Sequence, residues 1–153
     1  MRLNDIEAMR AAIEEANIAL AEGEMPVGCV VARNGEIIAR GHNLRARTGD
    51  PTAHAEIVAI RRAAEAIGDW RLEDCALYVT LEPCPMCAGA ISQARVHRLI
   101  YGAADERYGC AGSVYRIPED PAFMHFCRCE GGLLAEECAA PIRAFFDARR
   151  GGT

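Results

Sequence analysis

The chain has 153 residues, of which 51% are hydrophobic and 25% are charged, so it is long enough for one globular domain with an adequate core. Its formal net charge of -5 and isoelectric point near 5.4 argue against a protein that coats nucleic acid through bulk positive charge. The first 21 residues contain scattered acids and no apolar run of roughly 18 to 20 residues, so we expect no signal peptide and no membrane span, and we predict one cytoplasmic domain over residues 1–153.

The first half of the chain predicts one helix and then a β-hairpin. Apolar residues recur at intervals of three and four in the helical segment, and Asn4 or Asp5 can serve as its N-cap. The Asn-Gly pair at 34–35 favours a type I′ turn between two strands. The expected segments are a helix over 5–21, strands over 27–32 and 36–41, and a loop over 45–51.

The second half alternates helices with strands, which predicts a three-layer α/β/α sandwich. Thr52 stands where it can cap the first of these helices, and Gly68 stands where it can close it. Pro83 and Pro85 precede the second helix, where proline is tolerated in a first turn. The expected segments are helices over 52–66, 86–94 and 135–149, and strands over 76–80, 98–101 and 126–130.

Two short motifs carry the chemistry of this chain. An H-x-E triplet contains His54 and Glu56, and a P-C-x-x-C motif contains Cys84 and Cys87. One imidazole and two thiolates make three zinc ligands, and a catalytic zinc keeps its fourth position for water, whereas a structural zinc is normally closed by four protein ligands. We therefore predict one zinc ion per chain, held by His54, Cys84 and Cys87, with Glu56 as the proton carrier.

Helix geometry explains how these residues can share one site. Cys84 and Cys87 are three positions apart, so in a first helical turn they lie on one face, where the positive end of the helix dipole favours their thiolates. His54 and Glu56 are only two apart, so both can serve one metal only at the beginning of a helix. The two helix N-termini are thus expected to meet above the C-terminal ends of the strands, where open α/β sheets hold ligands.

Simpler interpretations of the two motifs explain less. A redox C-x-x-C pair would leave the H-x-E triplet without a role. A structural zinc would need a fourth ligand, for which His42, His97 and His125 are the candidates. A non-catalytic, zinc-stabilised binding module remains a remote alternative.

The other cysteines are expected to be reduced thiols, because no export signal accompanies them. His125, Cys127 and Cys129 place three soft ligands within five residues, but their spacing is tighter than usual zinc spacing, and strand alternation is the favoured interpretation. Four cysteines stand singly among apolar or small residues and are expected in the core, namely Cys29, Cys75, Cys110 and Cys138.

All 17 basic residues are arginine, and a planar guanidinium suits phosphate and base recognition. Biased genomic base composition is the simpler explanation for most of them. The candidates for a local basic patch are Arg45, Arg47, Arg61, Arg62, Arg149 and Arg150.

Together, H-x-E and P-C-x-x-C form the signature of zinc nucleobase deaminases. Longer segments closely resemble the bacterial tRNA-specific adenosine deaminases, within the cytidine deaminase-like superfamily, and the resemblance covers nearly the whole chain. The segments that carry it are M-P-V-G at 25–28, D-P-T-A-H-A-E-I at 50–57, L-Y-V-T-L-E-P-C at 77–84 and M-C-A-G-A at 86–90.

This resemblance implies a five-stranded mixed sheet, a homodimer, and conversion of adenosine to inosine at the wobble position in a tRNA anticodon loop. It also implies that Glu56 moves protons between the water that zinc activates, the ring and the leaving amine. The backbone N–H of Ala55 and the side chain of Asn43 are expected to hold the base, and Asp105 is expected near the ribose.

Two segments depart from the family's pattern on the substrate side. Residues 106–110 read E-R-Y-G-C where the tRNA enzymes often carry a lysine and small residues, and Met124 stands where an asparagine is expected. With the acidic isoelectric point, these departures leave a deaminase of a free nucleobase or nucleoside, of guanine, cytosine or adenine type, as an alternative. In such an enzyme Tyr108, Phe145 or Phe146 would serve as a lid.

Overall fold

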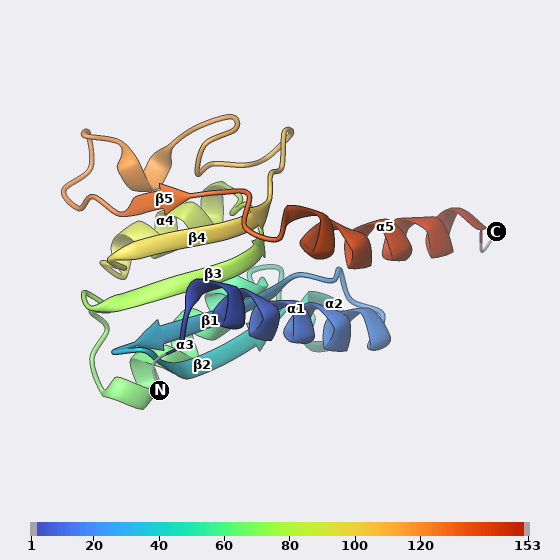
Figure 1. The fold of residues 1–153 in the computed structure, drawn as a ribbon, viewed down its shortest axis with the longest axis horizontal. Coiled ribbons are helices and arrows are strands. Elements are labelled where there is room, and N and C mark those ends of the chain that lie inside the picture. Colours follow the sequence, from blue (N-terminus) through green and yellow to red (C-terminus); the bar gives the residue numbers. More distant parts are fainter. Residues whose placement is uncertain (1–2, 152–153) are drawn as a thin grey trace.

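Five strands form the central sheet in the computed structural model, which describes residues 3–151 (Figure 1). The strand order is β2-β1-β3-β4-β5. β1 pairs antiparallel with β2 and with β3, whereas β3 with β4 and β4 with β5 are parallel, so the predicted mixed sheet is confirmed. The strands are β1 (Gly28–Arg33), β2 (Glu36–His42), β3 (Cys75–Leu81), β4 (Arg98–Ala103) and β5 (Arg128–Glu130).

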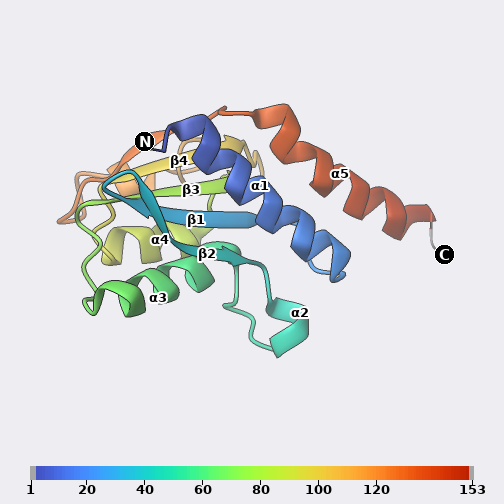
Figure 2. The same cartoon turned by 60° about the horizontal axis from the view of Figure 1, so that its bottom comes forward.

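Helices cover both faces of this sheet, which confirms the three-layer α/β/α architecture. Figure 2 shows α1 and α5 over one face, with α3 and α4 below the other. Strand residues alternate between these layers, so Leu77 and Leu99 pack toward α3 and α4, whereas Tyr78 and Ile100 pack toward α1 and α5. The helices are α1 (Asp5–Ala21), α2 (Arg45–Thr48), α3 (Ala55–Ile67), α4 (Pro85–Gln93) and α5 (Ala135–Gly151), with a 3₁₀ turn η1 at Ile117–Glu119.

Local signals account for the first three elements. Asn4 caps α1 by accepting a hydrogen bond from the Glu7 N–H, and the Glu7 carboxylate accepts one from the Asn4 N–H in return. Asn34 and Gly35 both have positive φ, 53° and 77°, as the predicted type I′ turn requires. At Gly28 a Cβ would lie 1.9 Å from the carbonyl oxygen of Ala12, so only glycine allows α1 to pack this closely on β1.

The expected cap at Thr52 is wrong. Its N–H and hydroxyl donate to the carboxylate of Asp50, at 2.8 and 2.7 Å, so this side chain closes a turn before the helix. The chain stays non-helical until His54, which is the N-cap of α3. Gly68 ends the helix in the left-handed conformation, as predicted.

Two further boundaries differ from expectation. The segment 45–51 contains the single-turn helix α2, whose second and third N–H groups donate to the buried Glu24 carboxylate, 3.0 Å from Ala46 N and 2.6 Å from Arg47 N. β5 begins at Arg128 because the Cys127 N–H donates to the carbonyl of Pro118, at 2.8 Å, and so is not paired with β4. The other predicted elements agree with the structure to within two residues.

The single cysteines are buried, as predicted, and none of the eight cysteines forms a disulfide. Each of the four, Cys29, Cys75, Cys110 and Cys138, is at most 1% exposed. Over residues 3–151, no helix combines the length and the apolar content that a membrane crossing requires.

Candidate active site

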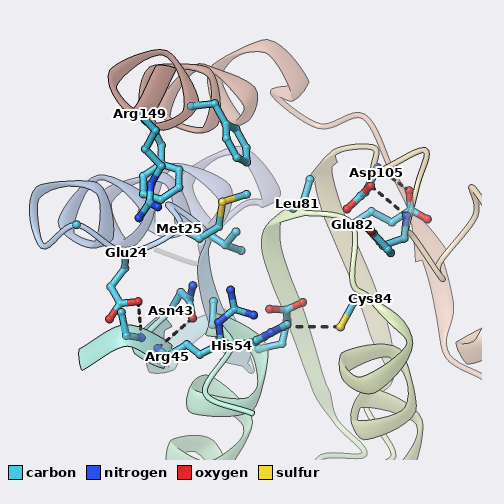
Figure 3. A pocket seen from close by; sticks show the side chains of 18 residues that line it. Glu24, Met25, Asn43, Arg45, His54, Leu81, Glu82, Cys84, Asp105 and Arg149 are labelled. Carbon is cyan, nitrogen blue, oxygen red and sulfur yellow. Dashed lines mark hydrogen bonds between the residues drawn. The ribbon is translucent and has the colours of Figure 1, made fainter. Parts of the chain in front are cut away.

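The three predicted zinc ligands converge at the N-termini of α3 and α4. Figure 3 shows two of them, His54 and Cys84, facing each other. His54 is the N-cap of α3, Cys84 is the N-cap of α4, and Cys87 lies in the first turn of α4. The Nδ1 atom of His54 lies 3.7 Å from Cys84 Sγ and 3.5 Å from Cys87 Sγ. All three ligand atoms lie within 4.8 Å of one another, as the motif spacing predicts.

This donor set fits a tetrahedral zinc ion. Zinc lies about 2.3 Å from a thiolate and about 2.0 Å from an imidazole nitrogen, so at a tetrahedral angle the nitrogen and sulfur atoms lie roughly 3.6 Å apart. The two His54–cysteine distances, 3.7 and 3.5 Å, match this separation. Three ligands of this type leave one coordination position for water, which is the arrangement of a catalytic site.

One of the three ligands, Cys84, is already in the deprotonated form that binds a metal ion. Hydrogen bonds from Cys87 and from His54 lower the pKa of Cys84 to about 4, so this group is a thiolate. Cys87 keeps the proton that the two thiols share, and its pKa is therefore raised, chiefly by its hydrogen bond to Cys84. A divalent cation at this position would replace that proton.

Glu56 is the acid of this site. It is the second residue of α3 and is 4% exposed. Burial raises its pKa from 4.5 to about 7. Its own backbone N–H and the nearby His54 act in the opposite direction and lower this pKa, whereas the negative charge of Cys84 raises it further. A carboxyl group that titrates near neutral pH is suited to accept a proton and return it.

A cavity of about 670 Å³ opens over these residues. His54, Glu56 and Cys84 line it together with Asn43 and Asp105, so the structure brings the predicted substrate residues to the same hollow. Part of the remaining wall carries aromatic and basic side chains from α5, α2 and the loop after β4, namely Phe145, Phe146, Arg149, Arg45 and Tyr108. The rest includes apolar residues such as Met25, Val27 and Leu81 and the two acids Glu24 and Glu82.

The predicted substrate residues differ in the hydrogen bonds that they already make within the protein. Asn43 is 6% exposed, and its Oδ1 accepts the Arg45 N–H at 3.2 Å, which orients the amide. Ala55 is the first residue of α3, where the backbone N–H has no intrahelical acceptor. The Oδ1 of Asp105 accepts the N–H groups of Arg107 and Tyr108, each at 3.1 Å, so Asp105 shapes its own turn while lining the cavity.

Several other candidates lie apart from the site. His42 is held between Glu15 and Glu22, at 2.8 and 2.9 Å, and the Nε2 of His125 contacts the Val96 carbonyl oxygen at 2.7 Å. His97 lines a second hollow at the opposite end of the sheet, and Met124 is exposed outside the cavity wall. None of the three histidines supplies a fourth ligand, because within residues 3–151 only His54, Cys84 and Cys87 group as metal ligands.

The second cluster of soft ligands is part of the fold. Cys127 is fully buried in the core beneath α4, and the Cys129 thiol donates to the Cys127 carbonyl at 3.4 Å. In the described part of the chain, His125 does not group with them as a metal site. The favoured interpretation, strand alternation, agrees with this arrangement.

The candidate arginines do not form one patch. Arg45 and Arg149 line the cavity. Arg47 pairs with Glu22, and Arg62 donates to the carbonyl of Arg40. Only part of the predicted group therefore faces the site.

Glu82 was not among the predicted site residues, although it is 2% exposed and its carboxylate accepts hydrogen bonds from the loop after β4. An acid placed directly after a buried strand and before Pro83 was a signal, because a charge in such a position needs partners.

Comparison with known proteins places the chain in a family. Residues 3–103 match the model of the cytidine and deoxycytidylate deaminase zinc-binding region. A tRNA-specific adenosine deaminase of Bacillus subtilis is 48% identical over 90% of this chain and 86% of its own length.

Two solved structures are also similar. One, from work on A-to-I editing by tRNA:A34 deaminases at the wobble position, has a TM-score of 0.84 at 45% identity, covering 88% of this chain and 97% of that one. A guanine deaminase from Bacillus subtilis has a TM-score of 0.64 at 41% identity, covering 67% of this chain and 66% of that one.

Proposed function

This chain belongs to the cytidine and deoxycytidylate deaminase family, within its group of bacterial tRNA-specific adenosine deaminases, and on that premise we propose that it converts adenosine to inosine at the wobble position of tRNA. The reaction is a zinc-dependent hydrolytic deamination. Water adds to the ring carbon that carries the amine, and ammonia leaves.

One observation carries this proposal. The cavity joins the His54–Cys84–Cys87 cluster and the buried Glu56 to a wall of aromatic and guanidinium groups. Recognition of single-stranded RNA uses such groups, because aromatic rings and arginine planes stack on splayed bases while guanidinium groups pair with phosphates. Phe145, Phe146 and Arg149 come from one helix, α5, and Arg149 lies over the Phe145 ring at 4.3 Å. A free base needs the cavity floor but not these stacking and guanidinium groups.

The residues of the site divide the work. Zinc, when bound to His54, Cys84 and Cys87, acts as a Lewis acid that lowers the pKa of water. Glu56 would take a proton from the water and give it to the ring nitrogen. It would then take a second proton, from the hydroxyl that has added to the ring carbon, and give it to the amine, so that ammonia leaves as the carbonyl forms. Asn43 and the Ala55 N–H hold the base so that the amine-bearing carbon faces Glu56.

We also propose that the protein acts as a homodimer in the cytoplasm, where tRNA is available. Supporting the dimer, large apolar side chains are exposed along the segment after β4. They are Val114, Tyr115, Phe123, Met124 and Phe126. Light scattering with size-exclusion chromatography tests the assembly, and a monomer at micromolar concentration contradicts it.

The substrate is tested by one comparison. The zinc-loaded protein is incubated with an anticodon stem-loop carrying a wobble adenosine and, separately, with guanine, cytosine, adenine and their nucleosides, while inosine and ammonia are measured. We expect inosine in the stem-loop, and binding that weakens steeply with added salt because phosphates are engaged. Rapid ammonia release from a free base, with no inosine in the stem-loop, contradicts the proposal and favours a small-molecule deaminase.

A further inference from the structure

Glu82 joins the metal-ligand segment to the loop that forms one wall of the cavity. It follows β3 directly and lies two residues before Cys84. The loop after β4, residues 104–113, folds around its carboxylate, and this loop carries the cavity residues Asp105 and Tyr108. Figure 3 shows Glu82 beside Asp105, across the cavity from Asn43.

Four donors converge on this carboxylate. Oε1 accepts the Asp105 N–H at 3.1 Å and the Ser113 hydroxyl. Oε2 accepts the Ala111 N–H at 3.1 Å and the Ser113 N–H at 2.9 Å. An ionised carboxylate has about four lone-pair positions, so all of them are used.

Because all of its acceptor positions are filled, the Glu82 carboxylate has a different role from that of Glu56. Glu56 lines the cavity at the metal-ligand cluster, whereas the acceptor positions of Glu82 are filled by the loop after β4. Three of its four donors are backbone N–H groups of the loop, which points to a role in holding the backbone. Hydrogen bonds to an ionised acceptor are worth about twice neutral ones, so the loop is held firmly.

The packing around Glu82 also requires one particular loop conformation. A Cβ on Gly109 would lie 2.3 Å from Glu82 Cδ and 2.4 Å from the Asp105 carbonyl oxygen. Beside this contact, the Cys110 N–H donates to the Pro83 carbonyl at 2.8 Å, and the Glu82 N–H donates to the Ala103 carbonyl at 2.9 Å. The loop is thus attached to residues 82–83, immediately before the first thiolate ligand.

We propose that Glu82 is a positioning residue for substrate, which fixes the wall of Asp105 and Tyr108 at a set place relative to the zinc ligands. This inference rests on the proposed deaminase function, because it assigns the wall to substrate binding.

The test is Glu82→Gln, which keeps the size of the side chain. Its amide oxygen offers about two acceptor positions in place of four, and its NH₂ group faces N–H donors. We expect KM for the wobble-adenosine stem-loop to rise roughly tenfold, with kcat changed by less than about threefold, because the wall that the substitution loosens binds substrate away from the reacting carbon. Glu65→Gln, at an exposed position of α3, is the control for the loss of charge and should leave both constants unchanged.

A second readout does not depend on substrate. Hydrogen exchange should become faster at the amides of Asp105, Ala111 and Ser113 in Glu82→Gln, while bound zinc stays at one per chain. Gly109→Ala would disturb the same contact from the loop side, because the added methyl group would meet the Glu82 carboxylate. It should give the same KM increase while Glu82 itself is unchanged. If wild-type protein deaminates only a free base, the proposed function fails, but the exchange result still decides whether Glu82 holds the loop.

Two results overturn the inference. Unchanged KM and unchanged amide exchange in Glu82→Gln would show that the loop does not depend on this carboxylate. Loss of zinc, with a fall in kcat and no change in KM, would instead assign Glu82 to support of the Cys84 segment.

Discussion

The acidic side chains at the two ends of the central strands differ in whether they have a basic partner. At the end where β4 begins, Arg98 lies between two carboxylates, bonding Asp5 at 3.0 and 2.5 Å and Glu130 at 3.2 Å. The Tyr78 hydroxyl donates to the same Asp5. At the other end, Glu56 is buried without an ion-pair partner among the described residues.

The pKa values reflect this difference. Arg98 holds the pKa of Asp5 and of Glu130 below their ordinary values, so these acids are stabilised as anions. Burial raises the pKa of Glu56 to about 7, so its anion is destabilised. Matched charges therefore tie α1 and β5 to the sheet at one end, whereas the other end keeps a reactive acid at a cost in stability. Substitutions at the two ends test this division, from the largest expected effect to the smallest.

His54→Ala should reduce deamination to background, because two thiolates alone do not complete the zinc site. Zinc per chain and inosine formation are measured together, and added zinc should not restore the variant. His97→Ala, at the opposite end of the sheet, is the matched control and should keep both zinc and activity. Full activity in His54→Ala would remove the metal centre from the mechanism.

Asn43→Ala should lower kcat/KM by roughly 10²-fold while zinc stays bound, since a buried amide that holds the base is lost. Asn43→Asp keeps the acceptor for the Arg45 N–H but loses the NH₂ donor. If activity falls as far in Asn43→Asp, recognition uses the donor. If Asn43→Asp is as active as wild type, the side chain only shapes the α2 segment.

Arg98→Gln should lower the free energy of unfolding by about 1 kcal/mol at neutral pH and leave deamination unchanged, because it breaks only the distal network, which is partly exposed. The folded-state pKa values of Asp5 and Glu130 are depressed, so their contribution is present above the ordinary values of 3.8 and 4.5 and is lost as pH falls through the folded values. Urea titrations should therefore show the gap between wild type and variant closing below about pH 4. A constant gap at acid pH would mean that the arginine stabilises by packing.

Arg10→Gln should change stability by less than about 0.5 kcal/mol, since its pair with Glu137 joins α1 to α5 at the exposed surface. The same titrations measure it. A loss as large as that of Arg98→Gln would show that this surface pair contributes as much to stability as the distal network does.

Sequence reasoning reached the metal cluster because its signal is chemical and local. His54, Cys84 and Cys87 stand at helix beginnings that the sequence itself marks, and the hairpin at 34–35 has an equally local cause. The predicted start of α3 was wrong because Thr52 hydrogen-bonds to the Asp50 side chain and does not cap the helix. Helix propensities do not show which of these two hydrogen-bonding arrangements a threonine will adopt.

The rest of the site depends on contacts across the fold. Glu24 caps α2 from 22 residues away, and Glu82 gathers donors from up to 31 residues along the chain. No sequence pattern pairs such positions. The charge network of Arg98 is equally remote, since Asp5 lies 93 residues earlier.

The most direct test of the catalytic centre is a paired measurement on Glu56→Gln, which keeps the size of the side chain and removes the acid. We predict zinc at one per chain, an unchanged unfolding midpoint or a small gain, and inosine formation reduced by about 10³-fold or more, because proton transfer loses its carrier. Inosine formed by Glu56→Gln at the wild-type rate would contradict the account and would leave the zinc with a structural role.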